Sequence, residues 1–519
     1  MPPTSLRRLA FSCLAVWAAS EAAAAPPKMD VDDPKAPVSY FKKVRPIFQA
    51  HCQGCHQPAK AKGGYVMTDF AKLLAGGEEC TKDGTLAIVP SDPDKSVLVH
   101  QITPTPGSGA NERGAAEMPP KKAPLPDVDI ALIRRWIAEG AKDDTPANAR
   151  QRIDAEHPPI YTRAPVVTSL DFSPDGALLA VAGFHEVLLW KADGSELVAR
   201  LIGLSERVQT VRFSPDGKQL AASGGRPAQM GEVQIWDVAT RKLALSAPVG
   251  FDTVYGVNWS PDGKLVSFGC PDNTLRAIDA ETGAQVLQGG SHNDWVLDTA
   301  FTAKGDQLVS VGRDMSVKLT EVATQRFIDN ISSITPGALR GGIHQVVRHP
   351  EREEFLVGGS DGVPQAYRTV RKVQRRIGDN ALCIRKWPAM EGRIYAVDFA
   401  PDGKSFAAGS SLDGKGAVNF YNYDFNTEPP AEITAMEGKD NRTEDEKKKL
   451  EAYYISDAKL LGSVPLESGI YALAYRPDGA QLAVAGDDGK VRLITPGDAK
   501  VLKEFVPVPI SAAPTTAAK

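Results

Sequence analysis

A short turn motif recurs through the last two thirds of this chain and limits the folds open to it. "FSPDG" stands at 172–176 and 213–217, with variants at 259–263, 301–305, 399–403 and 475–479, and a degenerate copy, "RHPEREE", begins at Arg348. The final glycines of the first four copies, 176, 217, 263 and 305, are 41, 46 and 42 residues apart. Such spacing is typical of stacked supersecondary units that bury a face against one another. Seven copies therefore predict seven units.

Each unit reads as short strands separated by tight turns. Proline presets φ, and Asp-Gly tolerates the left-handed positions of a turn, so "PDG" separates two apolar runs of strand length. A third run can end in tryptophan, as in "VLLW" at Trp190 and "VQIWD" at Trp236. This organisation is similar to the WD-repeat (WD40) β-propeller family. The resemblance covers about 340 residues and implies an all-β, seven-bladed propeller at 161–506.

One copy, "SHNDWVLDTAFTAKGDQLVSVGRDMSVKLTEV", resembles that family most closely. The resemblance implies that His292, Ser310 and Asp314 are three members of the family's internal hydrogen-bonded tetrad. Thr320 stands where the tetrad's tryptophan is expected. We therefore expect an incomplete tetrad in this unit.

Residues 37–145 have a different periodicity and read as a small helical domain. In "SYFKKVRPIFQAHC", apolar residues recur at helical spacing, and Pro46 must either kink that helix or begin its second part. In "PDVDIALIRRWIAEGA", isoleucines form a stripe flanked by Trp136, with Asp127 as the expected cap and Gly140 as the expected stop. Residues 146–160 read as a linker.

The hexapeptide "HCQGCH" carries the chemistry of the helical domain. Cys52, Cys55 and His56 form C-x-x-C-H, which is typical of c-type haem attachment. Two thiols add across the haem vinyl groups, and the next residue offers an imidazole to the iron. Zinc would need a second ligand pair, which the nearby Cys80 and His100 do not form. A thioredoxin-like redox site would need a βαβ context. We therefore predict one covalently bound haem c.

The second axial ligand is expected further along the chain. Methionine is the usual partner of histidine in electron-transfer cytochromes, where it raises the potential. Met118 in "AEMPPKK" lies 62 residues after His56, in a proline-rich loop before the last helix. Met67 is interpreted as a packing residue and His100 as a strand or helix-face residue. His51 is interpreted as the end of the helix that precedes the cysteines.

A second resemblance covers about 110 residues of the helical domain. The succession of "VSYFKKVRPIFQAHCQGCHQPAKAKGGY", "IVPSDPDKSVLVHQIT", "EMPP" and "LIRRWIAEGA" closely resembles the planctomycete-type cytochrome c domain. That family joins such domains to other exported modules, WD-repeat propellers among them. The resemblance implies Cys52 and Cys55 as thioether sites, His56 as proximal ligand and Met118 as distal ligand. Residues 75–87, with the extra Cys80, depart from the simpler loops expected there.

The remaining segments bear on location. Residues 1–25 read as a signal peptide, with a basic start, a short apolar core "LAFSCLAVWAA" and small residues up to Ala25. The apolar core is too short to span a bilayer. We expect a periplasmic or otherwise exported protein without stable membrane insertion. Residues 507–519 read as a disordered tail, and Cys270 and Cys383 as buried thiols.

About 30 surplus residues separate the sixth and seventh copies of the turn motif. They form an insertion at about 424–460, in which Thr443 and Glu446 predict a capping box and a short charged helix. We interpret the insertion as a solvated surface element, with a docking element as the alternative.

These features predict a multidomain protein: a small all-α cytochrome c domain, then an all-β propeller. The formal charge of −4 gives no reason to expect nucleic acid. We expect single-electron transfer, with the propeller docking a redox partner protein or acting as a scaffold. A haem-based redox or ligand sensor that signals through the propeller is one alternative, and a cytochrome-fed propeller oxidoreductase is another. The propeller holds four histidines and no nucleophile elbow or phosphate loop, so we expect no catalytic residues and no enzyme activity.

Overall fold

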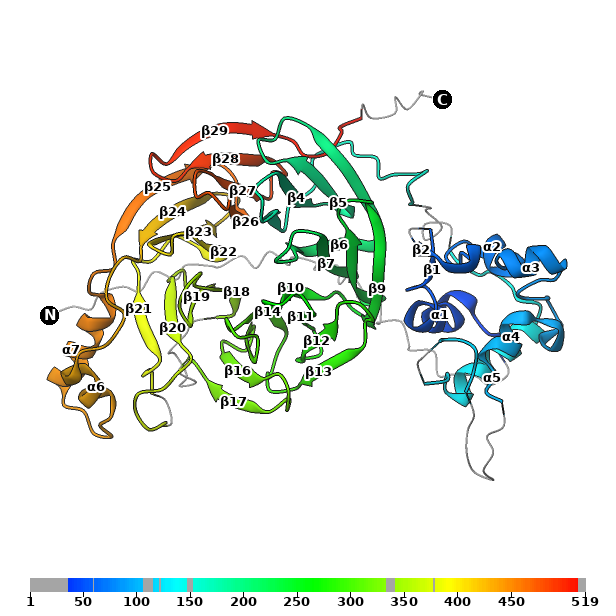
Figure 1. Ribbon diagram of the computed structural model, residues 1–519, viewed down its shortest axis with the longest axis horizontal. Coiled ribbons are helices and arrows are strands. Elements are labelled where there is room, and N and C mark those ends of the chain that lie inside the picture. The colour runs from blue at the N-terminus through cyan, green and yellow to red at the C-terminus, as the bar shows by residue number, and fades with distance from the viewer. Residues whose placement is uncertain are drawn as a thin grey trace, which may run out of the picture.

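The computed structural model describes residues 36–58, 60–105, 115–120, 123–146, 153–332, 341–376 and 379–511. The expected signal peptide, at 1–25, lies outside these ranges. Within them, a small helical unit lies beside the rim of a disc-shaped β-propeller (Figure 1). The predicted succession of a helical domain and a propeller is confirmed.

The helical unit is built from short elements. They are η1 (Tyr40–Val44), α1 (Arg45–His51), β1 (His56–Gln57), β2 (Lys60–Ala61), η2 (Lys62–Gly64), α2 (Phe70–Ala75), α3 (Glu78–Asp83), η3 (Pro93–Lys95), α4 (Val97–Ile102) and α5 (Asp127–Ala138). Pro46 lies in the first turn of α1, where its missing N–H costs nothing, so it begins the second part of the predicted helix. Asp127 is the first residue of α5 rather than its cap, because the N-cap position falls on Pro126.

One core holds these elements together. The isoleucine stripe and Trp136 of α5 are buried, as predicted. The Trp136 ring stacks on Tyr40, with centroids 5.3 Å apart, and meets Phe48 edge to face at 6.4 Å. Helices this short are marginal alone and depend on such packing. Cys80 of α3 is also buried in this core.

The helical unit is not purely helical. β1 and β2 form a two-stranded antiparallel ladder, with His56 opposite Ala61 and Gln57 opposite Lys60. The chain reverses after the cysteine turn, and the ladder satisfies backbone groups that a helix would otherwise satisfy. A two-residue ladder is too short to leave an alternating pattern in the sequence.

The propeller has seven blades within the described chain. Blades 1 and 2 share one long strand and form a single sheet of β3 (Leu170–Phe172), β4 (Leu178–Ala182), β5 (Phe184–Lys191), β6 (Leu197–Phe213), β7 (Gln219–Arg226), β8 (Met230–Asp237) and β9 (Lys242–Gly250). The first part of β6 pairs with β5 as the outer strand of blade 1, and its last part pairs with β7 as the inner strand of blade 2.

The other five blades are separate four-stranded antiparallel sheets. Blade 3 contains β10 (Tyr255–Trp259), β11 (Leu265–Gly269), β12 (Leu275–Asp279) and β13 (Gln285–Gly289); blade 4 contains β14 (Val296–Phe301), β15 (Gln307–Gly312), β16 (Val317–Glu321) and β17 (Phe327–Asn330). Blade 5 contains β18 (Ile343–Arg348), β19 (Glu354–Gly359), β20 (Gln365–Arg368) and β21 (Cys383–Lys386). Blade 6 contains β22 (Arg393–Phe399), β23 (Ser405–Ser411), β24 (Gly416–Asn422) and β25 (Leu460–Leu466). Blade 7 contains β26 (Ile470–Tyr475), β27 (Leu482–Gly486), β28 (Val491–Thr495) and β29 (Lys500–Phe505).

Polar side chains on the inner strands join neighbouring blades. The backbone N–H of Phe213 donates to Asp171 Oδ2 at 2.6 Å, and that of Val397 donates to Gln345 Oε1 at 2.7 Å. The Tyr475 N–H donates to Asp398 Oδ2 at 2.7 Å. Each carboxylate or amide thus fixes the spacing between two sheets.

The ring closes where its two ends meet. The Ser511 N–H donates to the Tyr161 carbonyl at 2.8 Å, and Tyr161 also forms a parallel bridge with Ile510. Trp190 Nε1 donates to the Pro507 carbonyl at 3.1 Å, and Val508 is buried. Residues 507–511, which the sequence assigned to a tail, therefore belong to the closure. Residues 512–519 lie outside the described ranges.

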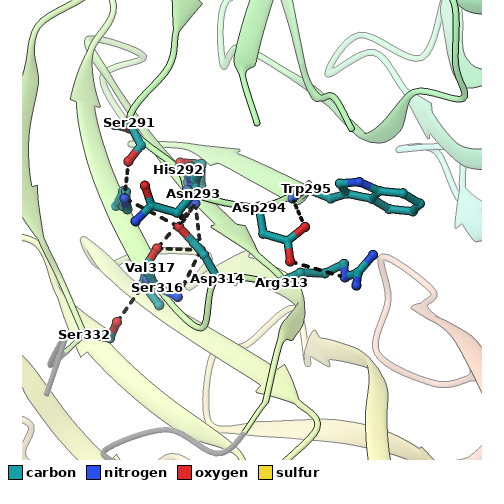
Figure 2. A network of polar contacts seen from close by, with 12 residues as sticks. Ser291, His292, Asn293, Asp294, Trp295, Arg313, Asp314, Ser316, Val317 and Ser332 are labelled. Carbon is teal, nitrogen blue, oxygen red and sulfur yellow. Dashed lines mark hydrogen bonds and ion pairs between the residues drawn. The ribbon is translucent and has the colours of Figure 1, made fainter. Parts of the chain in front are cut away.

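The predicted hydrogen-bond network of blade 4 is present (Figure 2). His292 Nδ1 lies 3.0 Å from Asp314 Oδ1, and His292 Nε2 lies 2.8 Å from Ser310 Oγ. Burial alone would raise the pKa of the Asp314 carboxyl, but the hydrogen bond and charge of His292, together with the Asn293 N–H and the Ser316 hydroxyl, hold it well below its usual range. Thr320 Oγ1 is buried without a hydrogen-bond partner among the described residues, so the network stops at Ser310.

The insertion of blade 6 forms two helices, α6 (Ala431–Glu437) and α7 (Glu444–Ile455). Thr443 and Glu446 form the predicted capping box at the start of α7. Ile433, Met436 and Leu450 are buried in a core that they share with blades 4 and 5, and α7 lies beside β21 (Figure 1). The insertion is therefore only partly the solvated element that the sequence suggested, because its apolar face completes the side of blade 5.

Candidate haem-attachment site

The two cysteines and His56 lie on one turn after α1. The Cys52 N–H still donates to the Phe48 carbonyl at 2.9 Å, as in a helix. The N–H groups of Cys55 and His56 then both donate to the Cys52 carbonyl, at 3.0 and 3.1 Å. The turn therefore gathers two sulfur atoms and one imidazole. His51 ends α1 and is exposed, as the sequence predicted.

The thiols of Cys52 and Cys55 are free and half-buried. Burial raises the pKa of the Cys52 thiol to about 12, and the charge of Cys55 adds to the rise. In this structure the two sulfurs do not form the disulfide that a redox C-x-x-C pair can form. Both stay available for thioether bonds.

The His56 imidazole is half-buried and held against the ring of Tyr65, with centroids 5.3 Å apart. Burial lowers its pKa, and the carbonyl groups of Lys62 and Tyr65 act in the opposite direction. The neutral imidazole is the form that binds a metal. His56 Nδ1 is buried and lacks a hydrogen-bond partner within the described ranges, so the side chain is not committed to an internal bond there.

Met118 lies where the chain returns to this core before α5. Its side chain is half-buried and packs, as Cys52 does, against the core of the helical unit. Its backbone N–H donates to the Gln101 carbonyl at 2.9 Å, and its peptide bond to Pro119 is cis. The hydrogen bond to Gln101 anchors the loop that presents the thioether. The assignment of Met118 as axial ligand stays a prediction.

The alternative ligands are engaged elsewhere. Met67 is 1% exposed and lies inside the core, in keeping with its interpretation as a packing residue. His100 is exposed on α4, and its Nε2 lies 2.8 Å from the Asp94 carbonyl.

The donor set fits a c-type haem. A covalent haem needs two reduced thiols, an adjacent neutral imidazole and an apolar surrounding. The turn supplies the first two, and a core of aromatic and aliphatic side chains supplies the third. Both amide atoms of Gln57, the next residue, are also buried without partners within the described ranges. Such atoms are rare in native proteins, and a bound group or an ordered water satisfies them.

Sequence reasoning missed the surroundings of the cysteine turn. α1 and β2 lie against β9, the outer strand of blade 2 (Figure 1). An ideal Cβ on Gly54 would stand 2.5 Å from the Ser246 carbonyl oxygen, so only glycine fits between the cysteines. Lys60 Nζ donates to the Ala244 carbonyl of the same strand. Gly54 is the only trace of this contact in the sequence, and a glycine in a turn has many explanations.

The described chain also contains two cavities that bear on the candidate site and the propeller. One, of about 310 Å³, lies between the helical unit and the propeller and is lined by Arg45, Asp154, His185 and Arg226, among others. The other, of about 500 Å³, is the central channel, lined by the inner strands of the blades. Three inner-strand carboxyl groups around it have raised pKa values because they are buried: Asp171 and Asp298, each to about 6, and Asp398, to about 7.

The propeller also contains two buried cysteines. Cys270 and Cys383 have the buried positions that the sequence predicted. Burial raises the pKa of each thiol to about 12.

A helical unit with a C-x-x-C-H turn, joined to a seven-bladed propeller, defines a cytochrome c-type module fused to a WD-type propeller. Residues 52–122 match the family model described as Planctomycete cytochrome C. Residues 157–189, 245–279, 382–415 and 459–495 match the model described as WD domain, G-beta repeat. The chain thus contains a planctomycete cytochrome c domain followed by WD40 repeats, and the cytochrome c family implies haem.

Several curated proteins are similar in sequence to part of this chain. Coronin-7 of Mus musculus is 29% identical over 188 residues, which is 34% of this chain and 20% of the relative. Coronin-7 of Pongo abelii is 31% identical over 180 residues, or 33% of this chain and 19% of the relative. "WD repeat and SOCS box-containing protein 1" of Danio rerio is 36% identical over 96 residues, or 18% of this chain and 22% of the relative. The chain spans about a fifth of the length of these relatives.

Proposed function

We propose that this protein is an exported electron carrier with one haem c. The haem is bound covalently through Cys52 and Cys55, with His56 and Met118 as its axial ligands. The observation that carries the proposal is the turn itself: two free thiols and a neutral imidazole with an unpartnered nitrogen, inside a cytochrome c family domain. Export agrees with this chemistry, because bacteria attach haem covalently outside the cytoplasm.

The residues of the chain have separable tasks in this proposal. The haem supplies a one-electron iron couple when bound. Thioether bonds fix it to one turn, and burial keeps His56 neutral for ligation. The apolar core around Tyr40, Phe48 and Trp136 excludes water. The loop of Met118 offers a thioether, which favours the reduced iron.

The propeller is proposed as a docking or scaffold module for a redox partner protein, not as a second catalytic centre. Three of its four histidines have separate polar partners: His292 in the blade 4 network, His344 beside Ser360, and His349 against the Gly403 carbonyl. The fourth, His185, packs edge to face against Phe184 and lines the cavity beside the helical unit. In the described chain, the group of side chains close enough to share a metal ion is Asp154, Glu156 and His157, which lies outside the blades. The described helices are all too short or too polar to cross a membrane.

Absorption spectra of the purified holoprotein test the proposal. We expect a low-spin haem with the weak far-red band of thioether ligation and no reaction with carbon monoxide. Met118→Ala should abolish that band and lower the reduction potential, because iron loses its thioether. Met67→Leu is the matched control and should keep both. A high-spin, carbon-monoxide-reactive haem in the native chain would contradict Met118 ligation and favour a ligand sensor. A second chromophore would favour an oxidoreductase.

A further inference from the structure

The turn that is proposed to carry the haem touches the propeller at a definite place. The Ser246 carbonyl of β9 lies so close to Gly54 that an added Cβ would be 2.5 Å from it, and Pro248 Cδ would be 3.2 Å from that Cβ. The Lys60 ammonium donates to the Ala244 carbonyl on the same strand. Blade 2 therefore covers the outer side of the cysteine turn.

A buried carboxylate lies directly behind this contact. Ser246, whose carbonyl faces Gly54, donates its hydroxyl to Glu232 Oε2 at 2.6 Å. Ser205 Oγ and Gln234 Nε2 donate to Glu232 Oε1 at 2.8 and 2.6 Å. Glu232 is 1% exposed. Its three partners all donate, which is the arrangement that an ionised carboxylate takes.

Arg226 is a neighbouring cation, and its ion pair within the described residues is not with Glu232. Arg226 lies close enough for Glu232 to raise its pKa, although burial has the larger, opposite effect. Its closest ion-pair contact within the described residues is with Glu206, at 3.9 Å. Glu232 is thus a buried carboxylate bound by three neutral side chains.

We propose that Glu232 is a positioning residue that the propeller contributes to the haem site: its charge favours the oxidised iron and holds the reduction potential down. The inference rests on the proposed haem at Cys52 and Cys55. Oxidation adds one positive charge to the haem, and a fixed carboxylate across the Gly54 contact stabilises that charge. Such interactions are strong where burial excludes water. The propeller then lowers the reduction potential of the haem as well as supporting the helical unit.

A purely structural role is the alternative reading of Glu232. The carboxylate joins β8 to β6 and β9, and Gln234 in turn accepts from Trp236 Nε1 at 3.0 Å. Loss of these bonds would destabilise blade 2 without moving the potential. A measurement of the reduction potential therefore distinguishes the two roles of Glu232.

Glu232→Gln is the first test, because it removes the charge and keeps the shape. We expect the ratio of ferrous to ferric protein at a fixed ambient potential to rise several-fold; a tenfold rise equals 59 mV for one electron. Glu232→Asp keeps the charge and should stay close to the native value. Glu354→Gln is the matched control, because Glu354 is a buried carboxylate of blade 5. It should not move the potential.

Different results would overturn the proposed function and the proposed role of Glu232. Native protein without covalent haem would overturn the proposed function. Haem-loaded Glu232→Gln with the native potential would overturn the role of Glu232. If that variant does not fold, Glu232→Met with Ser205→Ala and Ser246→Ala removes the charge together with two of its donors. We expect the same rise in the ratio of ferrous to ferric protein, and an unchanged reduction potential would again overturn the role of Glu232.

Gly54→Ala tests whether the contact between Gly54 and β9 transmits the effect of Glu232 on the reduction potential. No left-handed φ requires glycine here, so the added methyl group acts by pushing β9 away. The shift caused by Glu232→Gln should shrink in this background, because the charge lies further from the haem. Equal shifts in both backgrounds would show that the interdomain contact does not transmit the effect.

Discussion

Asp398 gives a quantitative test of the central channel. Burial is the main cause that raises its pKa to about 7; the Tyr475 N–H and Arg212 lower it, and Asp171 raises it. An unfolded aspartate has a pKa of about 3.9. Because the folded pKa is the higher one, the folded state binds the proton more tightly. The resulting stability is fully present below about pH 4 and is lost as the pH rises through about 7.

The size of the effect follows from this difference. Each pKa unit corresponds to about 1.4 kcal/mol, so the raised pKa of Asp398 reduces the unfolding free energy, relative to low pH, by about 1.5 kcal/mol at pH 5 and about 4 kcal/mol at pH 8. Asp398→Asn removes this cost and keeps an oxygen that can accept from the Tyr475 N–H. Relative to the native protein, the variant should therefore gain about 2–3 kcal/mol in unfolding free energy between pH 5 and pH 8.

Urea unfolding followed by circular dichroism measures this gain. Native protein and Asp398→Asn are compared at pH 5 and pH 8. Asp424→Asn removes an exposed carboxylate just after β24 of the same blade and serves as control. It shows what the loss of a carboxylate outside the channel does to the unfolding free energy. An equal effect of Asp398→Asn at both pH values would refute the idea that burial in the channel holds a proton on this carboxyl group.

Three further perturbations test the fold and the site. His292→Ala should cost about 2–4 kcal/mol in unfolding free energy, because it breaks the buried bonds to Ser310 and Asp314 and takes one partner from each of them; a loss under 1 kcal/mol by urea denaturation, on the order of a surface change, would contradict it. Leu450→Ala in α7 should cost about 2–4 kcal/mol if the insertion belongs to the core, and exposed Leu461→Ala is its control. Cys52→Ala should leave haem held by one thioether, seen as a shifted α-band in alkaline pyridine; an unchanged band would exclude Cys52 as an attachment site.

Local patterns predicted most of the elements. The "PDG" turns predicted stacked units of strands and the number of these units, because proline and glycine restrict the backbone wherever they occur. The resemblance to the WD-repeat family identified the units as propeller blades. The capping box at Thr443 depends on four consecutive residues and was equally readable. The boundaries were less readable. β6 runs through two blades, and residues 507–511 close the ring, because strands in this fold end where a neighbour stops pairing.

Some residues of the candidate site could likewise be predicted from the sequence, and others could not. Cys52, Cys55 and His56 lie within five consecutive residues, so their spacing alone predicts the haem chemistry. Met118 could be proposed from its proline-rich loop, but only folding brings that loop to the core that Cys52 also borders. Gly54 and Glu232 lie 178 positions apart in the sequence and meet through Ser246. Local spacing thus determines covalent chemistry and turns, whereas packing between the two domains decides which charges surround the proposed haem.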